Sequence, residues 1–535
     1  MELHGMNLVC GRPSAAGKTT FRAVDPARSA ALEPAFHEAT GEEIARAAQG
    51  AAGAFARHRR DAARTAALLE RIAQEIEALG DPLIERAAAE TGLPAGRLKM
   101  ERGRTVGQLR MFADLVAEGS WVDARIDRAD PRRRPVPKPD VRRMLIPLGP
   151  VAVFGASNFP LAYSVAGGDT ASALAAGNPV IVKGHPAHPG TSEMVGEAVR
   201  RAVEATGFPP AWFALLHGAS AEAGLSLVRQ AEVAAVGFTG SLRAGRALFD
   251  AAAARPRPIP VFAEMGSVNP ILLLPEALAQ RAEQIAEGLF QSFTLGVGQF
   301  CTKPGLVFAV EGTGFQRLRG TLEGLVRNHP PSTMLHRAIF DAFQQNVESL
   351  RRLPGVEVLR AETAGDPEKT QTAAVLILCD ESTILQHRAL TEENFGPAAV
   401  LVRCRTANSL AETFTALDLS GQLTAAVHGT AGELAEQEGL LALLERTAGR
   451  LIVDGFPTGV EVCPSIHHGG PYPATTDARW TSVGTAAIIR FARGVCYQGF
   501  PREQLPLELR NRNVRGIRRL VDGRWTTDDL AEEEG

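Results

Sequence analysis

The chain has 535 residues, of which 45% are hydrophobic and 22% charged, and its 57 basic side chains nearly balance 60 acidic ones. This length exceeds the usual size of a single core, so two or three domains are expected. The composition excludes an unfolded chain, and the formal net charge of -3 excludes a broad basic surface for nucleic acid or for an anionic membrane.

The cysteines and the N-terminal residues indicate in which cellular compartment the protein is expected. The six cysteines are Cys10, Cys301, Cys379, Cys404, Cys463 and Cys496. No CxxC pair occurs among them, which argues against a disulfide framework or a zinc cluster and favours a reducing environment. Glu2 and His4 stand where a secretory signal has basic residues, and no apolar run reaches the roughly 18 residues that span a bilayer. We therefore expect a cytoplasmic protein without a membrane partner.

A run near the start, Gly11 to Thr20, looks at first like a phosphate-binding loop because it contains Gly17, Lys18 and Thr19. That motif needs a glycine five positions before Gly17, where Arg12 stands, and a buried strand leading into it. We expect no phosphate site here.

The next segments predict a helix and a connector. Thr40 and Glu43 have the spacing of a capping box, and apolar residues recur at helical spacing from Phe55 to Leu79, which predicts an amphipathic helix. Between residues 131 and 143, prolines alternate with basic residues and no aromatic side chain is available for base stacking. This stretch is expected to be a solvated connector.

From Val151 onward, short β-branched runs alternate with alanine-rich helical stretches. This pattern is typical of parallel strands joined by helical crossovers, with ligands at the carboxyl ends of the strands. We expect one α/β domain ending near Met265 and a second one after it. The expected strands are 151–154, 180–182, 213–216 and 233–238 in the first, and 306–310, 374–378, 398–402, 425–428 and 451–453 in the second.

Two residues suggest chemistry. Cys301 lies three residues after Gly298 and directly before Thr302. Hydroxyl and backbone N–H donors in such a setting can stabilise a thiolate. The alternative is that a single cysteine is an inert apolar residue. Glu264 ends a predicted strand next to apolar Phe262, so it reads either as a partly desolvated carboxylate or as a surface ion pair. Their context decides between these readings.

Five short blocks occur together and in a fixed order. They are Ser157-Asn158-Phe159-Pro160-Leu161, Gly237-Phe238-Thr239-Gly240-Ser241, Glu264-Met265-Gly266, Gly298-Gln299-Phe300-Cys301-Thr302 and Glu393-Asn394-Phe395-Gly396-Pro397. With them the chain resembles the aldehyde dehydrogenase superfamily from about Met6 to Pro501. The resemblance implies an α/β protein with two Rossmann-like doubly wound domains, a small oligomerisation sheet and an active site between the domains.

The resemblance also implies a division of the chain. Residues 1–120 and 142–265 would form the dinucleotide-binding domain, and 266–484 the catalytic domain. The extended segments at 121–141 and 485–500, of which Trp121 to Ile126 and Ala486 to Tyr497 fit neither alternation, would be the oligomerisation strands of a homodimer or homotetramer. Residues 501–535 would be a C-terminal tail.

The resemblance implies the mechanism as well. Cys301 would attack an aldehyde to give a thiohemiacetal, with its oxyanion held by the Asn158 amide and the Cys301 backbone N–H. Hydride would pass to NAD(P), and Glu264 would activate the water that hydrolyses the thioester, which predicts a free carboxylic acid product. Many relatives carry a lysine in the helix after this asparagine, whereas this chain has Asp169 in that region, so no proton relay through such a lysine is expected.

For the cofactor, Lys183 matches the family's lysine that contacts the adenosine ribose. Gly240 and Ser241 would open the helix that faces the pyrophosphate. Glu393 would hold the nicotinamide ribose, with Phe395 beside it.

Pro186 lies three residues after Lys183, at the position where NAD-selective relatives usually carry a glutamate. The chain departs from those relatives here. Without the carboxylate, the 2′-phosphate of NADP is tolerated. His185 or Arg243 could assist it, although each also reads as an ordinary exposed side chain. The cofactor is therefore expected to be NADP or NAD, with NADP favoured.

Met100, Arg104 and Gln108 recur at four-residue spacing and would share one helical face. Similar helices line the substrate tunnel in the family. Arg104 is therefore expected either to pair with a distal carboxylate of the aldehyde or to remain solvated.

Three further stretches, 184–192, 455–462 and 468–476, resemble one branch of the family. That branch contains α-ketoglutarate semialdehyde (2,5-dioxopentanoate) dehydrogenases and an NADP-dependent fatty aldehyde dehydrogenase. Arg104 favours oxidation of 2,5-dioxopentanoate to 2-oxoglutarate. A fatty or other apolar aldehyde, or a non-catalytic scaffold with the same fold, are the alternatives.

Phe159, Thr458, Val460 and His468 are expected to bind the substrate, the last three around the mouth of the pocket. His467 and His468 predict no metal site, because adjacent side chains diverge and the sequence offers no evident third ligand.

Overall fold

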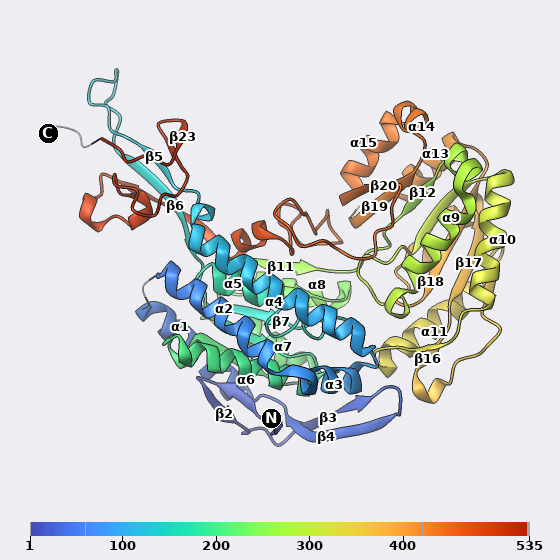
Figure 1. The fold of residues 1–535 in the computed structure, drawn as a ribbon, viewed down its shortest axis with the longest axis horizontal. Helices are drawn as coiled ribbons and strands as arrows, with labels where there is room; N and C mark the ends of the chain where they lie inside the picture. The colour runs from blue at the N-terminus through green and yellow to red at the C-terminus, as the bar shows by residue number, and fades with distance from the viewer. Residues whose placement is uncertain (1, 59, 420, 532–535) are drawn as a thin grey trace.

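The computed structural model describes residues 2–58, 60–419 and 421–531, and three large sheets organise them (Figure 1). The first sheet has the order β11-β10-β7-β8-β9-β1-β2, parallel from β11 to β9 and antiparallel at β1 and β2. The four strands expected here are confirmed, with β10 starting two residues later than predicted. The strands are β1 (Asn7–Val9), β2 (Arg12–Ser14), β7 (Val151–Phe154), β8 (Val180–Lys183), β9 (Phe213–Leu216), β10 (Ala235–Thr239) and β11 (Val261–Glu264).

Helices cover both faces of this sheet because its buried strands are apolar on both sides. Val180 and Val182 enter one core with the residues of α2, α4, α5 and α6, whereas Ile181 enters another with those of α1, α7 and α8. The helices are α1 (Gly41–Arg57), α2 (Ala62–Ala78), α3 (Gly80–Thr91), α4 (Ala95–Glu118), α5 (Gly168–Ala175), α6 (Pro189–Ala205), α7 (Ala221–Arg229) and α8 (Leu242–Ala253).

The predicted capping box at Thr40 and Glu43 is confirmed, but the single helix predicted as far as Leu79 is wrong. The chain breaks after α1, and Asp61 caps a new helix by accepting a hydrogen bond from the Arg64 backbone N–H. A capping aspartate competes with helix continuation, which the apolar periodicity does not reveal.

The second sheet has the order β15-β17-β18-β13-β12-β19-β20 and is parallel except at β15. The five expected strands are present, and β12 and β15 are additional. The strands are β12 (Ile271–Leu273), β13 (Leu306–Val310), β15 (Glu357–Arg360), β17 (Val375–Asp380), β18 (Ala398–Cys404), β19 (Gln422–His428) and β20 (Ala448–Val453). The helices are α9 (Pro275–Thr294), α10 (Thr313–Arg327), α11 (Arg337–Arg351), α12 (Glu381–Gln386), α13 (Ala407–Leu417), α14 (Ala431–Glu436) and α15 (Glu438–Thr447).

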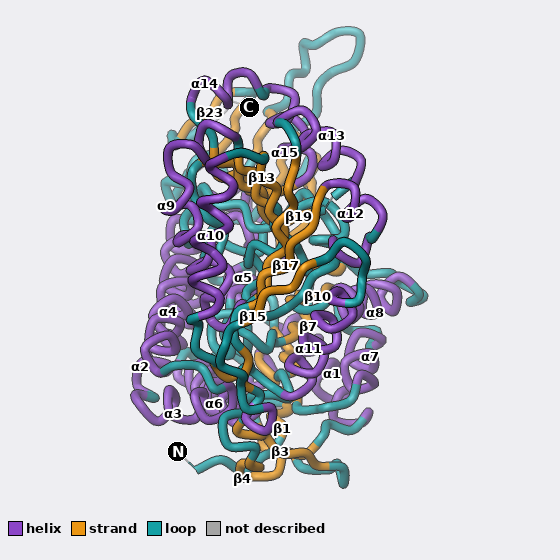
Figure 2. The backbone as a smooth tube through the Cα atoms, turned by 90° about the vertical axis from the view of Figure 1, so that its right-hand side faces the viewer, coloured by secondary structure: helices purple, strands orange, loops and turns teal. Residues whose placement is uncertain are grey.

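Seen from the side, the strands of both sheets occupy the middle of the molecule (Figure 2). Helices α2, α4, α9 and α10 lie on one side of them, and α7, α8, α12 and α13 on the other. The carboxyl ends of β7, β8, β10 and β11 carry residues of the cavity described below.

The third sheet forms an arm that projects from the body (Figure 1). Its order is β21-β6-β5-β22-β23, so the two predicted extended segments share one sheet but are separated by β6. Residues expected as a tail contribute β22 and β23, and Trp121 lies in a short 3-10 helix; positions 532–535 of that tail lie outside the described residues. The strands are β5 (Arg125–Asp127), β6 (Val141–Pro147), β21 (Ala492–Gln498), β22 (Arg519–Val521) and β23 (Arg524–Thr526).

Two shorter features complete the description. A hairpin of β3 (Thr20–Asp25) and β4 (Ala30–His37) follows Lys18, so the residues that mimic a phosphate loop lead into a strand and not a helix. A second pair joins β14 (Ser332–Thr333) to β16 (Gln371–Thr372). Within the described ranges, no helix combines the length and the apolarity needed to cross a membrane.

Candidate active site

Glu264 belongs to the part of the chain built on the first sheet and Cys301 to the part built on the second, here called the first and second domains, and the two residues meet between them. Glu264 is the last residue of β11, whereas Cys301 follows the short 3-10 helix Leu295–Gly298. Gly298 has φ +65°, and a Cβ there would lie 2.2 Å from the carbonyl oxygen of Gly396, so this approach requires glycine. The Asn269 amide donates to the Cys301 carbonyl at 2.8 Å and fixes the loop beyond it.

His468 joins these two residues. Its Nε2 lies 3.0 Å from Glu264 Oε1 and 3.7 Å from Cys301 Sγ. The imidazole is fully buried, so the expected position at the pocket mouth is wrong. Ser482 Oγ donates to the other oxygen of Glu264, which leaves the carboxylate held from both sides.

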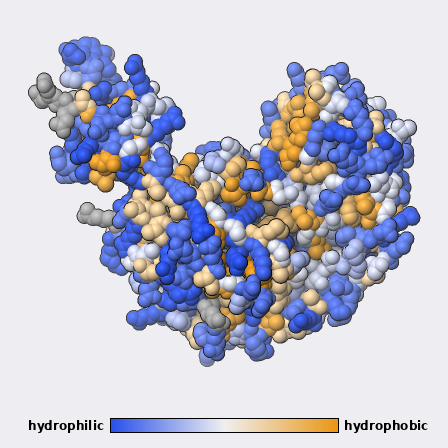
Figure 3. Space-filling model, in the orientation of Figure 1, coloured by the Kyte–Doolittle hydropathy of each residue, from blue (hydrophilic) through white to orange (hydrophobic). Residues whose placement is uncertain are grey.

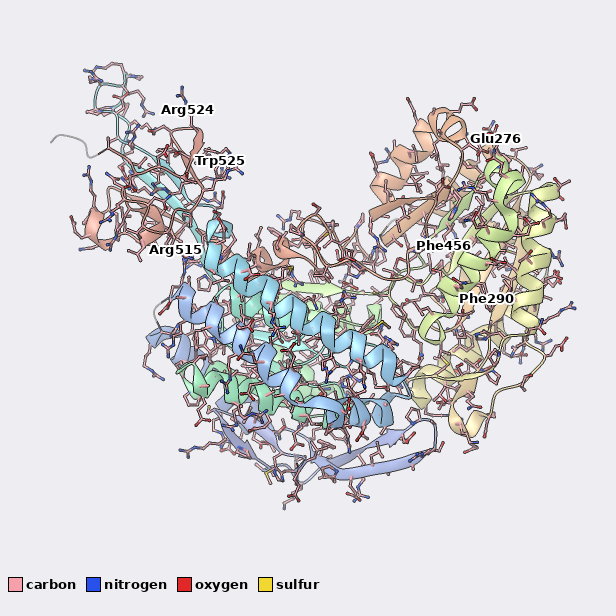
Figure 4. The ribbon with its side chains drawn as sticks, in the orientation of Figure 1. Glu276, Phe290, Phe456, Arg515, Arg524 and Trp525 are labelled. Atoms are coloured by element: carbon pink, nitrogen blue, oxygen red, sulfur yellow. The ribbon has the colours of Figure 1, made fainter. Side chains whose placement is uncertain are left out.

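The segment from 454 to 484 brings His468 here by returning from the second domain to the first. Phe456 anchors its start against α9, where a Cβ on Gly288 would come within 2.2 Å of the Phe456 ring (Figure 4). At its other end, the Met265 backbone N–H donates to Ala474 at 2.7 Å. The sheet edge at Glu264 thus gains a partner that is far away in sequence.

The two reactive groups differ in protonation. Burial raises the pKa of the Cys301 thiol well above its usual value, and the Glu264 charge raises it further. Burial also raises the pKa of Glu264, but the charge of His468 and hydrogen bonds from His468 and Ser482 outweigh it, so this pKa lies below its usual value. A protonated thiol therefore stands beside an ionised carboxylate.

Asn158 is buried next to Cys301, and its side-chain amide donates to the Gln299 carbonyl at 3.1 Å. The loop that follows it is held by Glu101 of α4, whose Oε1 accepts from the backbone N–H groups of Leu161 and Ala162 at 2.8 and 3.0 Å. The amide is thus fixed beside the nucleophile before any substrate binds.

A cavity of about 620 Å³ extends from this cluster between the two domains. Its lining includes Glu264, Cys301 and Glu393, and also the N-terminus of α8, capped by Ser241. Gly266 lies so close to Glu393 that a Cβ would come within 2.4 Å of its carboxylate. The unpaired backbone N–H groups of a helix N-terminus bind phosphate, so the cavity fits a dinucleotide with its pyrophosphate at α8.

The same cavity is also lined by Lys183, His185, Pro186 and Arg243, together with His336 of the second domain. The His185 ring lies 6.1 Å from that of His336. Burial lowers the pKa of His336 to about 4 and that of His185 well below its usual value. Both rings are therefore neutral near pH 7 and can donate hydrogen bonds.

Arginine and aromatic side chains surround the other side of Cys301. Arg104 is half-buried, donates to Tyr163 Oη at 3.0 Å and lies 5.8 Å from the Phe159 ring centroid. Its charge lowers the pKa of Cys301, which places it near the nucleophile. Of the other residues on the predicted face, Met100 is 72% exposed and Gln108 is buried, so one shared face toward the substrate is wrong.

The other two residues predicted to bind the substrate, Val460 and Thr458, lie in different parts of the structure. Val460 packs with Phe159 and Tyr163 in one apolar cluster. Thr458 Oγ1 lies 2.7 Å from Ser292 Oγ, within the second domain behind Thr302. Glu393 and Phe395 line the cavity, as Lys183, Gly240 and Ser241 do.

Sequence reasoning missed four residues that lie close to these groups, namely Tyr163, His336, Arg450 and Ser482. Tyr163 lies five positions after Asn158, a spacing that could have indicated it. His336, Arg450 and Ser482 lie far from the motifs in sequence, and only the fold brings them here.

Comparisons with known proteins add a family and close relatives. The protein-family model described as "Aldehyde dehydrogenase family" matches residues 13–437 of this chain. Alpha-ketoglutaric semialdehyde dehydrogenase 2 of Azospirillum brasilense is 49% identical and covers 98% of this chain and 100% of its own length. The alpha-ketoglutaric semialdehyde dehydrogenase of Acinetobacter baylyi is 42% identical, with 98% and 99% covered.

Solved structures agree on the fold. Gamma-glutamyl-gamma-aminobutyraldehyde dehydrogenase from Burkholderia cenocepacia superposes with a TM-score of 0.80 at 19% identity, covering 93% of this chain and 97% of that one. The NAD+ complex of an aldehyde dehydrogenase from Bacillus cereus superposes with a TM-score of 0.78 at 20% identity, covering 92% and 96%. The expected fold class is confirmed.

Proposed function

The chain belongs to the aldehyde dehydrogenase family, whose members oxidise aldehydes with NAD(P)+, and from this premise we propose that it converts 2,5-dioxopentanoate to 2-oxoglutarate with NADP as the favoured cofactor. Two full-length relatives bear the name of that activity, and this likeness carries the proposal. The half-buried Arg104 close to Cys301 supports it, because the substrate has a carboxylate at the end opposite its aldehyde.

In the acylation half-reaction, Cys301 Sγ bonds to the aldehyde carbon. The thiol proton leaves to the ionised Glu264 or to solvent in the cavity, because His468 Nε2 already donates its hydrogen to Glu264 and cannot accept this proton. The carbonyl oxygen becomes an oxyanion that the Asn158 amide and the Cys301 backbone N–H stabilise. The thiohemiacetal on Cys301 would become the thioester by losing hydride, for which NAD(P)+ held in the cavity would supply the acceptor.

In the second half-reaction, water attacks the thioester on Cys301. Glu264 takes the proton from that water, so the carbon–sulfur bond breaks and the acid leaves. The attacking water would come from the larger cavity, which Cys301 and Glu264 both line. Hydrogen bonds from His468 and Ser482 keep the carboxylate ionised for this step.

The substrate carboxylate would bind on the arginine side of Cys301. Arg104 Nη2 donates to Tyr163 Oη, and the half-buried Arg450 lies close enough to Cys301 that a charge on this sulfur would raise the pKa of Arg450. Two guanidinium groups near one apolar cluster favour an anionic aldehyde over a fatty one, because an alkyl chain would leave them without a charged partner.

The preference for NADP rests on the adenosine end of the cavity. Pro186 offers no carboxylate to repel a 2′-phosphate, while Lys183, His185 and Arg243 provide donors around it. His336 adds a donor from the second domain. These groups would fit the additional phosphate.

Steady-state rates with both cofactors test this proposal, with 2,5-dioxopentanoate compared against pentanal. Arg104→Met should lower kcat/KM for the dicarbonyl acid about 10- to 100-fold, the value of one charge-assisted hydrogen bond, and leave pentanal oxidation nearly unchanged. Arg102→Met on another face of α4 is the matched control. Equal rates with both aldehydes in the unmodified enzyme would contradict the substrate assignment.

A further inference from the structure

We propose that Cys301, His468 and Glu264 form a binding site for a thiophilic divalent cation such as Zn²⁺, which would switch the enzyme off reversibly by occupying its nucleophile. The ligand atoms are Cys301 Sγ, His468 Nε2 and one oxygen of Glu264, and all lie within 4.8 Å of one another. This inference rests on donor geometry, and it does not depend on which aldehyde the enzyme oxidises.

The spacing of the donors fits tetrahedral zinc. Zinc binds sulfur at about 2.3 Å and nitrogen or oxygen at about 2.0–2.2 Å, so ligand atoms in a tetrahedron lie roughly 3.3–3.6 Å apart. Here Nε2 lies 3.0 Å from Glu264 Oε1 and 3.7 Å from Cys301 Sγ. Both distances are within a few tenths of an ångström of tetrahedral spacing, and the third, from Sγ to the carboxylate oxygen, is within 4.8 Å.

The three donors are also held in place by other contacts. Ser482 Oγ binds Glu264 Oε2, which leaves Oε1 directed at the cluster. The His468 backbone N–H donates to Thr481 at 2.8 Å, and the Asn269 amide binds the Cys301 carbonyl. Because the ligand side chains are already held in place, binding of the ion costs little conformational entropy.

Charge favours the same conclusion. A thiolate and a carboxylate together carry two negative charges, which a divalent cation neutralises inside a largely buried site. On binding, the thiol proton of Cys301 leaves to solvent, the His468 proton moves from Nε2 to Nδ1, and sulfur–metal and nitrogen–metal bonds form without any change of oxidation state. Three protein ligands leave the fourth position open toward the cavity that Cys301 and Glu264 line.

The ligands come from separate segments, at the end of β11, after the 3-10 helix at 295–298 and in the returning segment 454–484. Adjacent His467 and His468 therefore gave no hint of this set in the sequence. In the part of the chain that the structure describes, this is the one group of three such donors found within that distance. One ion per chain is expected.

The test uses the full chain, freed of metal by a chelator, without cofactor or aldehyde. Cd²⁺ titration should produce the thiolate-to-cadmium absorption band with one ion per chain. Zn²⁺ should compete with Cd²⁺ and abolish aldehyde oxidation, and EDTA should restore it. His468→Asn should weaken Zn²⁺ binding more than about tenfold, and Cys301→Ser should remove the absorption band.

Matched controls separate this site from adventitious binding. His467→Asn changes the neighbouring histidine, and Cys496→Ser removes an exposed thiol on the arm, so both should bind zinc like the unmodified protein. Zinc affinity unchanged in His468→Asn, or inhibition that EDTA does not reverse, would overturn the proposal. If His468→Asn does not fold, Cys301→Ser, which changes a single atom, decides the question through cadmium stoichiometry.

The two proposals fail in different ways. A protein that oxidises 2,5-dioxopentanoate but binds no zinc at Cys301 contradicts only the metal site. One that binds zinc but prefers pentanal contradicts only the substrate assignment.

Discussion

At the scale of single residues, the site consists of a protonated nucleophile and an ionised base that are adjacent but come from different domains. Burial and the Glu264 charge both raise the pKa of Cys301, whereas the partners of Glu264 lower its pKa. The chemistry therefore depends on a proton transfer that brings the thiolate into being when substrate is present. Glu264 has the geometry to serve twice, for the thiol and for the water.

Glu264→Gln should separate the two half-reactions. Removing a general base costs about 10² to 10⁴-fold in rate, and here that loss should fall on thioester hydrolysis. We expect a burst of up to one reduced cofactor per chain, followed by slow turnover, with the acyl group found on Cys301 by mass spectrometry. Ser482→Ala, which retains the carboxylate, should keep most of its turnover. A slow rate without any burst would instead assign Glu264 to the attack step.

Pro186→Glu tests the residue basis of cofactor choice. A carboxylate at the adenosine end of the cavity would repel the 2′-phosphate, so kcat/KM with NADP should fall at least about tenfold while the value with NAD stays similar. Pro186→Gln has a similar size without the charge and should keep the original ratio. The same loss in both variants would indicate a steric effect and contradict the electrostatic reason.

At the scale of secondary-structure elements, a buried ion pair ties α5 to the start of the arm. Arg490 donates to Asp169 at 2.8 Å, and the two side chains are 3% and 9% exposed. The pair connects α5 of the first domain to the residues that lead into β21. Asp169 thus has a buried structural partner in Arg490.

Asp169→Asn should therefore destabilise the protein markedly. Leaving a buried arginine without its counter-charge costs about 3–5 kcal/mol, which should appear as a lower Tm in thermal unfolding followed by circular dichroism. Glu222→Gln breaks the exposed pair with Arg229 and should change stability by less than about 1 kcal/mol. Equal Tm values for the two variants would show that the buried pair contributes little.

At the scale of the whole molecule, apolar side chains remain exposed on the arm and on the second domain (Figure 3). Trp525 at the end of the arm is 49% exposed, and Val453 on the edge strand β20 is 55% exposed. Figure 4 places Arg524 and Trp525 far out on this arm. Exposed apolar groups and open strand edges favour association between copies, which agrees with the expected homodimer or homotetramer.

Light scattering after size-exclusion chromatography should then give a multiple of the 56.9 kDa chain mass. Val453→Lys places a charge on the β20 edge and should reduce the assembled fraction. Val24→Lys, on the β3 hairpin and similarly exposed at 51%, should leave the mass unchanged. A monomeric mass for the unmodified chain would contradict the association.

The sequence by itself determined the fold class, most strands of both parallel sheets and the family, because alternating apolar runs and contiguous motifs are local properties. It predicted Cys301, Glu264 and Asn158, which lie within such motifs and meet in the structure. Tertiary structure decided what no local pattern encodes: that His468 is buried against both reactive groups, that His336 and Arg450 approach the site, and that Met100 faces solvent. The contacts of His468, His336 and Arg450 join segments more than a hundred residues apart, and the packing of two domains, not the spacing along the chain, sets their distances.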